Sequence, residues 1–405
     1  MTTAAKPTGK QGSTHGSSPT GWGMKVTCQQ DSLHKGLQTV GKAVANKTTL
    51  PVLNNILIST DGGRLKLAAT NLEVGITNWI GCQVEQEGAI TVPARLLLDF
   101  VSSLPNDKVT MTLDEKTRTL NIKCARHEAN IKGISSDEFP SIPEVTEKPL
   151  AKVPAPLLKE MINQVAFAAS SDDSRPVLAG VYVQIEGSEL TMAAADGFRL
   201  ARRVTTLDTP TGSPVKLIIP ARSMVELARA LQDDEGEGTD PVSLVVTANR
   251  NQVVFRHDNL EVTSRLVEGN YVDINRVIPT EWATRTVVAT SDLLKSVRVA
   301  SMFARDAANI IRLQMTFGSE LTPGVITVSA MAAEVGDNTS QLDCSVDGVA
   351  GDIALNAKFL MDVLNAVKTA QVALETKTYQ SPAVIKPVNG ELYLVVIMPM
   401  YIPNR

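Results

Sequence analysis

The residue types that most often carry chemistry are few in this chain of 405 residues, and they lie far apart. The four cysteines and four histidines form no Cys-x-x-Cys pair and show no metal-ligand spacing. Asp172 and Asp173 are adjacent carboxylates that would suit a metal ion, but flanking serines between a predicted helix and a predicted strand favour a turn. Phosphate-loop, zinc-protease and nucleophile-elbow motifs are absent. We therefore expect no catalytic residue, no metal and no cofactor, and a binding or structural role.

The bulk composition is that of a soluble globular protein, with 43% hydrophobic and 20% charged residues. No apolar run approaches the roughly 20 residues that a membrane span needs. Scattered, unpaired cysteines indicate a reducing compartment, so we expect a cytoplasmic protein. Residues 1–23 are rich in Gly, Ser, Thr and Pro and lack the apolar core of a signal peptide, which predicts a disordered N-terminal tail.

Internal repetition is the strongest pattern in the chain. Residues 175–203 read as two strands joined by a turn at Gly187-Ser188. A related stretch runs from Thr49 to Gly75, and a third, looser copy runs from Asn309 to Val335. A helix with a spaced apolar face precedes each copy, and a second helix and more strands follow it. The second helix starts after one of three similar phrases, at residues 92–95, 219–222 and 355–358.

The period of this repeat is a whole domain. We expect helices at 31–47, 94–104, 156–170, 221–231, 291–305 and 357–368, with antiparallel strands between them. Proline-bearing linkers follow the first and second copies. The sequence therefore predicts an α+β fold of three repeated domains, with helices on one face of antiparallel sheets. The expected divisions are 1–23 for the tail, 24–147, 148–281 and 282–405.

The charge is unevenly distributed between the helices and the rest of the chain. The six predicted helices carry 12 basic and 6 acidic residues, a net of +6, whereas the whole chain has a net charge of −4. The remainder therefore nets −10. Helix surfaces that simply favour Lys and Arg would explain this, but Glu is an equally good helix former and is scarce here. The alternative is that one face of the assembly meets a polyanion such as DNA.

The chain resembles the family of the bacterial DNA polymerase III β subunit, the sliding clamps, from about Met24 to Ile402. The phrases that carry the resemblance occur in order and with compatible spacing. They are Thr49-Leu50-Pro51-Val52-Leu53, Val92-Pro93-Ala94-Arg95, Asp137-Glu138-Phe139-Pro140, Asp196-Gly197-Phe198-Arg199-Leu200, Phe359-Leu360-Met361-Asp362-Val363-Leu364 and Tyr393-Leu394-Val395-Val396-Ile397-Met398-Pro399-Met400.

The resemblance implies a homodimeric ring that encircles double-stranded DNA without reading its sequence, with the helices lining the hole. Lys47 and Arg222 match DNA-contact positions of the family, and Arg95 is a third candidate, whereas Asp172 replaces a neutral DNA-facing residue. The full set expected to face DNA is Lys35, Lys42, Lys47, Arg95, Lys159, Arg222, Lys295, Arg298 and Lys358. Position matches also put Ile131 against Met302 and Phe303 at the dimer interface. The alternative is that all three are intramolecular core residues.

The family also implies a pocket for short linear motifs of the replicative polymerase, clamp loader, repair polymerases and mismatch-repair proteins. Two phrases without counterparts in the other copies, Gly197–Leu200 and Met398–Met400, suggest one such site between the second and third domains. Phe198, Val272 and Tyr401 depart from the residues common in the family. The expected pocket residues are Arg175, Leu178, Gly197, Phe198, Arg199, Leu200, Val272, Arg276, Val277, Val396, Met398, Pro399 and Met400.

Two other classes of protein stay open at this point. A multidomain enzyme could hold an anionic substrate between basic helices, but it needs a clustered acid and base that the sequence does not offer. A sequence-specific DNA-binding regulator needs a recognition helix with Arg, Asn or Gln at its exposed start, and none stands out.

Overall fold

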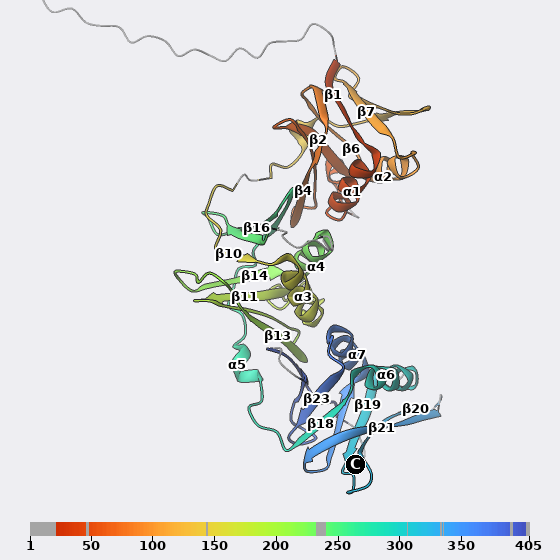
Figure 1. Cartoon of the computed structure of the whole chain (residues 1–405), viewed down its shortest axis with the longest axis vertical. Coiled ribbons are helices and arrows are strands. Elements are labelled where there is room, and N and C mark those ends of the chain that lie inside the picture. Colours follow the sequence, from red (N-terminus) through yellow and green to blue (C-terminus); the bar gives the residue numbers. More distant parts are fainter. Residues whose placement is uncertain are drawn as a thin grey trace, which may run out of the picture. The chain divides into compact units, whose positions relative to one another are not determined.

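The computed structural model describes residues 22–45, 48–142, 145–231, 240–305, 307–332, 334, 336–388 and 392–401 (Figure 1). Residues 1–21 of the expected tail lie outside the described residues, and the first strand begins at Trp22. The chain divides into two compact units. One comprises Met1–Ala69 with Trp79–Pro140, and the other comprises Thr70–Asn78 with Ser141–Arg405. In the part of the chain that the structure describes, no helix is both long and apolar enough to cross a membrane.

The first unit contains a five-stranded antiparallel sheet in the order β5-β1-β7-β8-β9, and β2 pairs with both β3 and β6. Helices α1 and α2 pack against each other. Along β7 and β8, buried residues alternate with more exposed ones, as one-sided burial of a strand requires. The elements of the first repeat are β1 (Trp22–Gln29), α1 (Gln30–Gly41), β2 (Asn55–Asp61), β3 (Arg64–Thr70), β4 (Val74–Gly81), β5 (Gln83–Gln86), β6 (Ala89–Pro93), α2 (Ala94–Ser102), β7 (Lys108–Asp114), β8 (Thr119–Cys124) and β9 (His127–Lys132). Of these, Val74–Asn78 of β4 belongs to the second unit.

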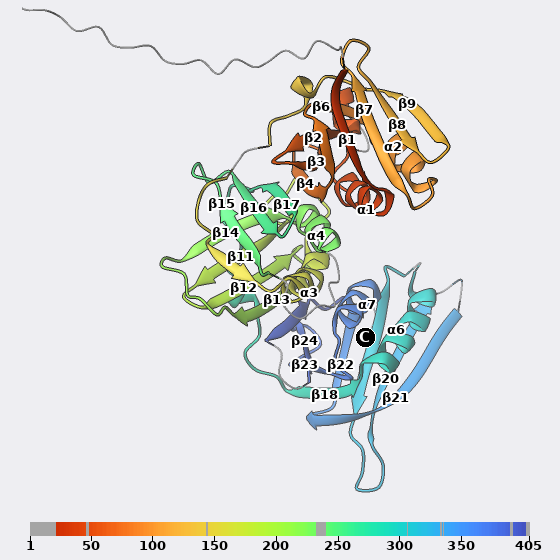
Figure 2. The same cartoon turned by 45° about the horizontal axis from the view of Figure 1, so that its top comes forward.

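The second unit holds the second and third repeats. In the second repeat, helices α3 and α4 lie side by side (Figure 2). The elements of this repeat are β10 (Ala151–Val153), α3 (Ala155–Val165), a 3-10 turn (Ala166–Ala168), β11 (Gly180–Glu186), β12 (Glu189–Ala195), β13 (Arg199–Thr206), β14 (Val215–Pro220), α4 (Ala221–Ala230), β15 (Val242–Val246), β16 (Gln252–His257) and β17 (Leu260–Arg265).

In the third repeat, α6 and α7 pack together and α6 lies against β19, β20 and β21 (Figure 1). The short helix α5 (Ile274–Val277) lies in the linker before this repeat. The elements of the repeat are β18 (Thr284–Ala289), α6 (Thr290–Ala304), β19 (Ile310–Thr316), β20 (Gly324–Ala332), β21 (Gly336–Gly348), β22 (Gly351–Asn356), α7 (Ala357–Ala366), β23 (Gln371–Thr376), β24 (Ala383–Pro387) and β25 (Tyr393–Ile397).

The strand pairing confirms the threefold repetition. In each repeat the first strand of the hairpin pairs both with its hairpin partner and with the strand that leads into the second helix. These central strands are β2, β11 and β19, and their second partners are β6, β14 and β22. The following helix starts at once, at Ala94, Ala221 and Ala357. The three phrases that the sequence repeats therefore mark three equivalent strand-to-helix junctions.

The repeats of the second unit are joined through their sheets. Strand β13 pairs with β25 in five register pairs, from Arg199 opposite Ile397 to Arg203 opposite Tyr393. This pairing makes one twelve-stranded sheet out of strands of the second and third repeats. The same joint occurs once more, because Val74–Asn78 pairs with β17. The last strand of one repeat thus pairs with the strand that follows the hairpin of the repeat before it.

Two local expectations about helices need correction. The helix expected over 31–47 ends at Gly41, and a 3-10 turn at Pro51–Asn54 precedes β2. Gly41 is the last helical residue, and because glycine is a poor helix former the helix ends there. The linker after the second repeat contains a short helix, α5, that we did not predict. The Asp273 side chain caps it by accepting a hydrogen bond from the amide of Asn275.

The start of α7 is capped by the side chain of Asn356. The Asn356 side chain accepts hydrogen bonds from the amides of Lys358 and Phe359, at 2.9 Å and 3.4 Å. We predict that Asn356→Ala destabilises the start of α7 by about 1 kcal/mol, because these amides lose their acceptor. Hydrogen exchange of the α7 amides should accelerate about fivefold. Asn356→Asp keeps the acceptor and should keep the protection; equal exchange in all three proteins would contradict the capping role.

Candidate functional site

Two features of the structure are candidate binding sites: the exposed faces of the paired helices and a small cavity beside the β12–β13 turn. The helices place their apolar residues on one face and their cations on the other. In α6, for example, Leu293, Val297 and Ala300 are buried, whereas Lys295 and Arg298 are exposed. Helical periodicity forces this separation, because residues three and four apart share a face.

Most of the cations predicted to face DNA lie on these exposed helix faces or at helix ends. Lys35, Lys42, Arg95, Arg222, Lys295, Arg298 and Lys358 are exposed. Lys159 is half-buried, and its Nζ donates a hydrogen bond to the carbonyl oxygen of Leu231, 3.3 Å away. Lys35 and Lys295 form ion pairs with acidic residues on their own helices. Lys47 lies outside the described residues.

The cavity beside the β12–β13 turn has a volume of about 140 Å³. Its floor is apolar and buried, and it comes from the twelve-stranded sheet through Ala195, Leu200 and Val396. Val272 and Val277 of the segment around α5 form an exposed part of the wall. Small-molecule sites are usually roughly 300–1,000 Å³. A cavity this small and apolar suits a side-chain anchor rather than a cofactor.

The structure brings eight of the expected pocket residues together around this cavity and leaves five outside its lining. The eight are Leu178, Gly197, Arg199, Leu200, Val272, Val277, Val396 and Met398. Arg175, Phe198, Arg276, Pro399 and Met400 do not line it. Ala195 lines it and was missed. The one sequence signal for Ala195 was its place next to the Asp196–Leu200 phrase.

Of the five residues outside the lining, some lie near the rim. Arg175 Nη1 is 4.0 Å from the point where a Cβ on Gly197 would be, and it belongs to a side chain whose Nε pairs with Asp172 at 2.8 Å. The hydrogen bonds from Ser174, together with this arginine, lower the pKa of Asp172 below its usual value. Phe198 is 61% exposed at the tip of the turn. Met400 donates its amide to the carbonyl of Ala354 in β22, 2.8 Å away.

Tyr271 contacts Ala195, which lines the cavity. Its ring stacks on Tyr182 with centroids 5.1 Å apart, and its hydroxyl oxygen accepts a hydrogen bond of 2.9 Å from the amide of Ala195. Burial raises the pKa of Tyr271 to about 12, so the hydroxyl stays protonated at neutral pH. Both rings also line a larger cavity, of about 670 Å³, that contains none of the predicted site residues. Tyr271 therefore lines the larger cavity and is hydrogen-bonded to Ala195, which lines the smaller one.

The residues expected at a dimer interface differ in exposure. Met302 is 59% exposed and Phe303 is half-buried, both near the end of α6. Ile131 is only 4% exposed, because it lies on β9 opposite Leu120 within the first unit. The burial of Ile131 agrees with the core alternative for this residue, whereas Met302 has no such burial.

No group of three or more His, Cys, Asp or Glu side chains that could hold a metal ion occurs among the described residues. The four cysteines are free thiols. Burial raises the pKa of Cys28 to about 12, which disfavours the nucleophilic thiolate.

Comparison with known proteins gives one consistent result. Three family models match: the N-terminal domain of the DNA polymerase III beta subunit at residues 24–143, its central domain at 152–273 and its C-terminal domain at 275–401. The beta sliding clamp of Bacillus subtilis is 30% identical over 387 residues, covering 93% of this chain and 99% of the relative. That of Synechocystis is 31% identical over 402 residues, covering 94% and 100%.

Solved structures agree with these relatives. The crystal structure of the Bacillus subtilis DNA polymerase sliding clamp has a TM-score of 0.86 and 29% identity, covering 94% of this chain and all of that one. The Pseudomonas aeruginosa sliding clamp, solved with griselimycin bound, has a TM-score of 0.84 and 28% identity over the same shares. Similarity over nearly the whole length, in all three domains, means that this chain belongs to the DNA polymerase III beta subunit family, the bacterial sliding clamps.

Proposed function

We propose that this protein is a sliding clamp that encircles duplex DNA and tethers the replicative polymerase to it. The observation that carries the proposal is the full-length family match on a chain that presents cations from three equivalent helix pairs. Attraction between cations and phosphates carries little sequence information, so it permits sliding. The family is an accessory factor for processivity, and we assign no reaction to the chain itself. Its place of action would be the cytoplasm, where bacterial replication occurs.

The joint between repeats supports a closed dimer. Within the chain, the strand after the hairpin pairs with the last strand of the next repeat at Val74–Asn78 and at β13. In the third repeat the corresponding strand is β21, whose Gly336–Cys344 stretch pairs only with β20 among the described strands. In the first repeat, β9 is an edge strand that pairs with β8 alone among the strands that the structure describes. Free strand edges tend to find a partner. A second copy would supply β9 to β21, next to Met302 and Phe303.

We assign the three clamp domains to residues 24–147, 148–281 and 282–405. In the ring, the inner surface would carry Lys35, Lys42, Lys47, Arg95, Lys159, Arg222, Lys295, Arg298 and Lys358. Because every domain contributes cations, the charge around the duplex would be diffuse, and no single contact would hold the clamp in place.

The 140 Å³ cavity would take apolar anchors of short motifs from the polymerase, the clamp loader and repair proteins. A buried apolar floor with an exposed rim is the arrangement in which a few anchor side chains supply most of the binding energy. Griselimycin, which the Pseudomonas aeruginosa clamp binds, is a suitable probe for this site.

Encirclement itself predicts a dependence on DNA topology. Clamp loaded onto nicked circular DNA should stay bound through gel filtration, and it should be lost once a restriction enzyme linearises the circle. A protein that holds DNA by surface contacts alone is indifferent to the cut. Equal retention on both forms would therefore reject the ring and favour an enzyme or a regulator.

The helix cations predict the salt dependence of the weak contact with duplex DNA. Removing one phosphate contact lowers the log–log slope of affinity against salt by about 1. We predict this effect for Arg222→Ala and for Lys358→Ala, measured by fluorescence anisotropy with a short labelled duplex. Lys216→Ala, on the exposed side of β14, removes the same charge from a sheet and should leave the slope unchanged. An equal effect at Lys216 would mean that the location of the charge is irrelevant.

The cavity predicts which methionine matters for motif binding. Met398 lines it and Met400 does not. We predict that Met398→Ala weakens griselimycin binding by about 1–3 kcal/mol, as truncation of an anchor pocket does. Isothermal titration calorimetry measures the change, with Met331→Ala as the control at a methionine that is exposed on β20. Unchanged affinity in Met398→Ala would remove the cavity from the proposed site.

A further inference from the structure

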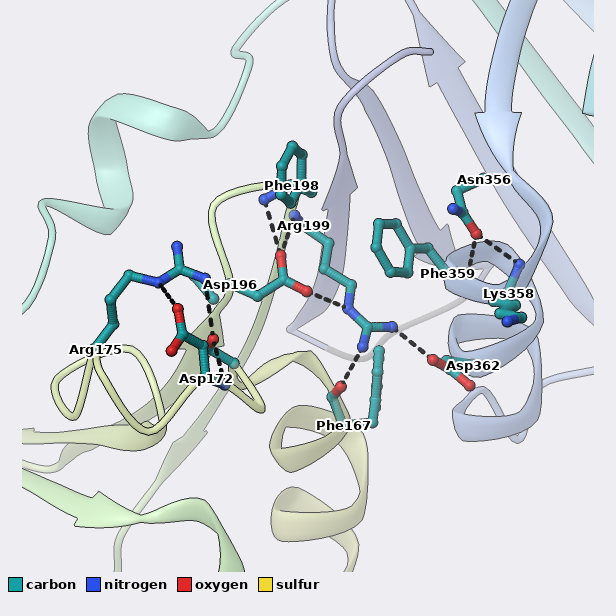
Figure 3. Close-up of polar contacts among 12 residues, drawn as sticks. Phe167, Asp172, Arg175, Asp196, Phe198, Arg199, Asn356, Lys358, Phe359 and Asp362 are labelled. Carbon is teal, nitrogen blue, oxygen red and sulfur yellow. Dashed lines mark hydrogen bonds and ion pairs between the residues drawn. The ribbon is translucent and has the colours of Figure 1, made fainter. Parts of the chain in front are cut away.

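Arg199 is held inside the protein although it follows the exposed Phe198. Its side chain is 10% exposed, and its three guanidinium nitrogens donate to three different elements (Figure 3). Nε donates to Asp196 Oδ2 at 3.0 Å and Nη2 donates to the carbonyl oxygen of Phe167 at 2.6 Å. Nη1 donates to Asp362 Oδ2 at 2.6 Å, on α7 of the third repeat. The guanidinium therefore links the β12–β13 turn to the 3-10 turn that follows α3 and to α7.

Two aromatic rings complete the site of this guanidinium. The Phe359 ring centroid lies 4.4 Å from the guanidinium carbon, and the Phe167 centroid lies 5.4 Å from it. Arginine suits such a site because its planar cation stacks on rings while it donates hydrogen bonds in its plane. A lysine would keep the charge but could not reproduce three donors in fixed directions.

Asp196 connects the Arg199 guanidinium to the backbone of the turn through hydrogen bonds. While Oδ2 accepts from Arg199, Oδ1 accepts from the amides of Phe198 and Arg199 at 2.8 Å and 3.0 Å. Gly197 between them has a φ of +97°, which glycine adopts without strain. The carbonyl of Phe198 in turn accepts the amide of Met398, 2.8 Å away, and Met398 lines the cavity. An unbroken series of contacts thus runs from α7 to the cavity wall.

We propose that Arg199 is a positioning residue, which fixes the shape of the motif pocket by fastening the β12–β13 turn to Asp362 of α7. Arg199 also lines the cavity, but each of its three guanidinium nitrogens donates a hydrogen bond within the protein, so its main effect on a bound peptide is to hold the turn. The affinity of the pocket therefore depends on a residue, Asp362, that does not line it. This inference rests on the proposed motif pocket.

The test uses Asp362→Ala, which leaves every residue that lines the cavity unchanged. We expect griselimycin to bind about fivefold more weakly, equivalent to about 1 kcal/mol, because the turn loses its attachment to α7. Arg199→Lys should weaken binding at least as much, and the double variant should be no weaker than Arg199→Lys alone, since both changes break one series of contacts. Hydrogen exchange at the amides of Phe198 and Arg199 should accelerate in Asp362→Ala.

Lys368→Ala is the matched control. Lys368 Nζ pairs with Glu160 Oε2 at 3.4 Å, so this bridge also links the α7 region to α3 but does not reach the turn. It should leave both griselimycin affinity and the two turn amides unchanged. If Asp362→Ala binds as the unmodified clamp does, or if Lys368→Ala weakens binding equally, the positioning role is wrong. If the unmodified clamp does not bind griselimycin, that result contradicts the proposed pocket itself and not only the positioning role of Arg199.

Discussion

The pairing of β13 with β25 is the constraint on which the candidate site depends. It joins the second and third repeats through five register pairs, and Tyr393 on β25 also donates its hydroxyl to the carbonyl oxygen of Gln164 on α3 at 2.9 Å. Buried backbone groups must stay hydrogen-bonded, so the two repeats cannot hinge apart here without breaking the ladder. The cavity lies at one end of this pairing, where Leu200 faces Val396. Its floor is therefore formed before any ligand arrives, which lowers the ordering cost of binding.

Local patterns predicted much of the fold. The helices that follow residues 93, 220 and 356 start where the repeated phrases indicate, because a preceding proline or asparagine and a spaced apolar face are properties of neighbouring residues. The turn at Gly187-Ser188 also lies between β11 and β12 as expected. The joints between repeats were not predictable in the same way. Strands β13 and β25 lie almost two hundred residues apart. The sequence of each predicts an apolar strand but does not indicate which strand it pairs with.

The sequence predicted which residues gather at the candidate site, but it did not predict what each side chain does there. Gly197, Arg199 and Leu200 of the Asp196–Leu200 phrase line the cavity, together with leucine and valine side chains from other parts of the chain. Arg199 belongs to the same phrase, yet its guanidinium turns towards α7 (Figure 3). That direction is set by Asp362 and Phe359, which no local pattern connects with it. Ile131 shows the same limit, because an apolar residue on an edge strand reads alike whether its own unit or a partner buries it.

The turn at the candidate site has a counterpart with the same backbone geometry in the first repeat. In the first repeat Asn71 Oδ1 accepts the amides of Glu73 and Val74 at 3.0 Å and 2.9 Å, as Asp196 Oδ1 accepts those of Phe198 and Arg199. The residue after the Asx side chain has a positive φ in both turns, +74° at Leu72 and +97° at Gly197.

A leucine in this conformation costs roughly 1–2 kcal/mol, so the turn geometry persists in the first repeat even at the expense of strain. The turn is therefore a requirement of the strand joint that follows it, since Val74 and Arg199 each begin the pairing with the next repeat. What differs is the side chain at that starting position. Valine offers no donor, whereas arginine reaches the helix of the following repeat. The two joints thus share a turn geometry, and the pocket differs from the first-repeat joint in the side chains that the turn carries.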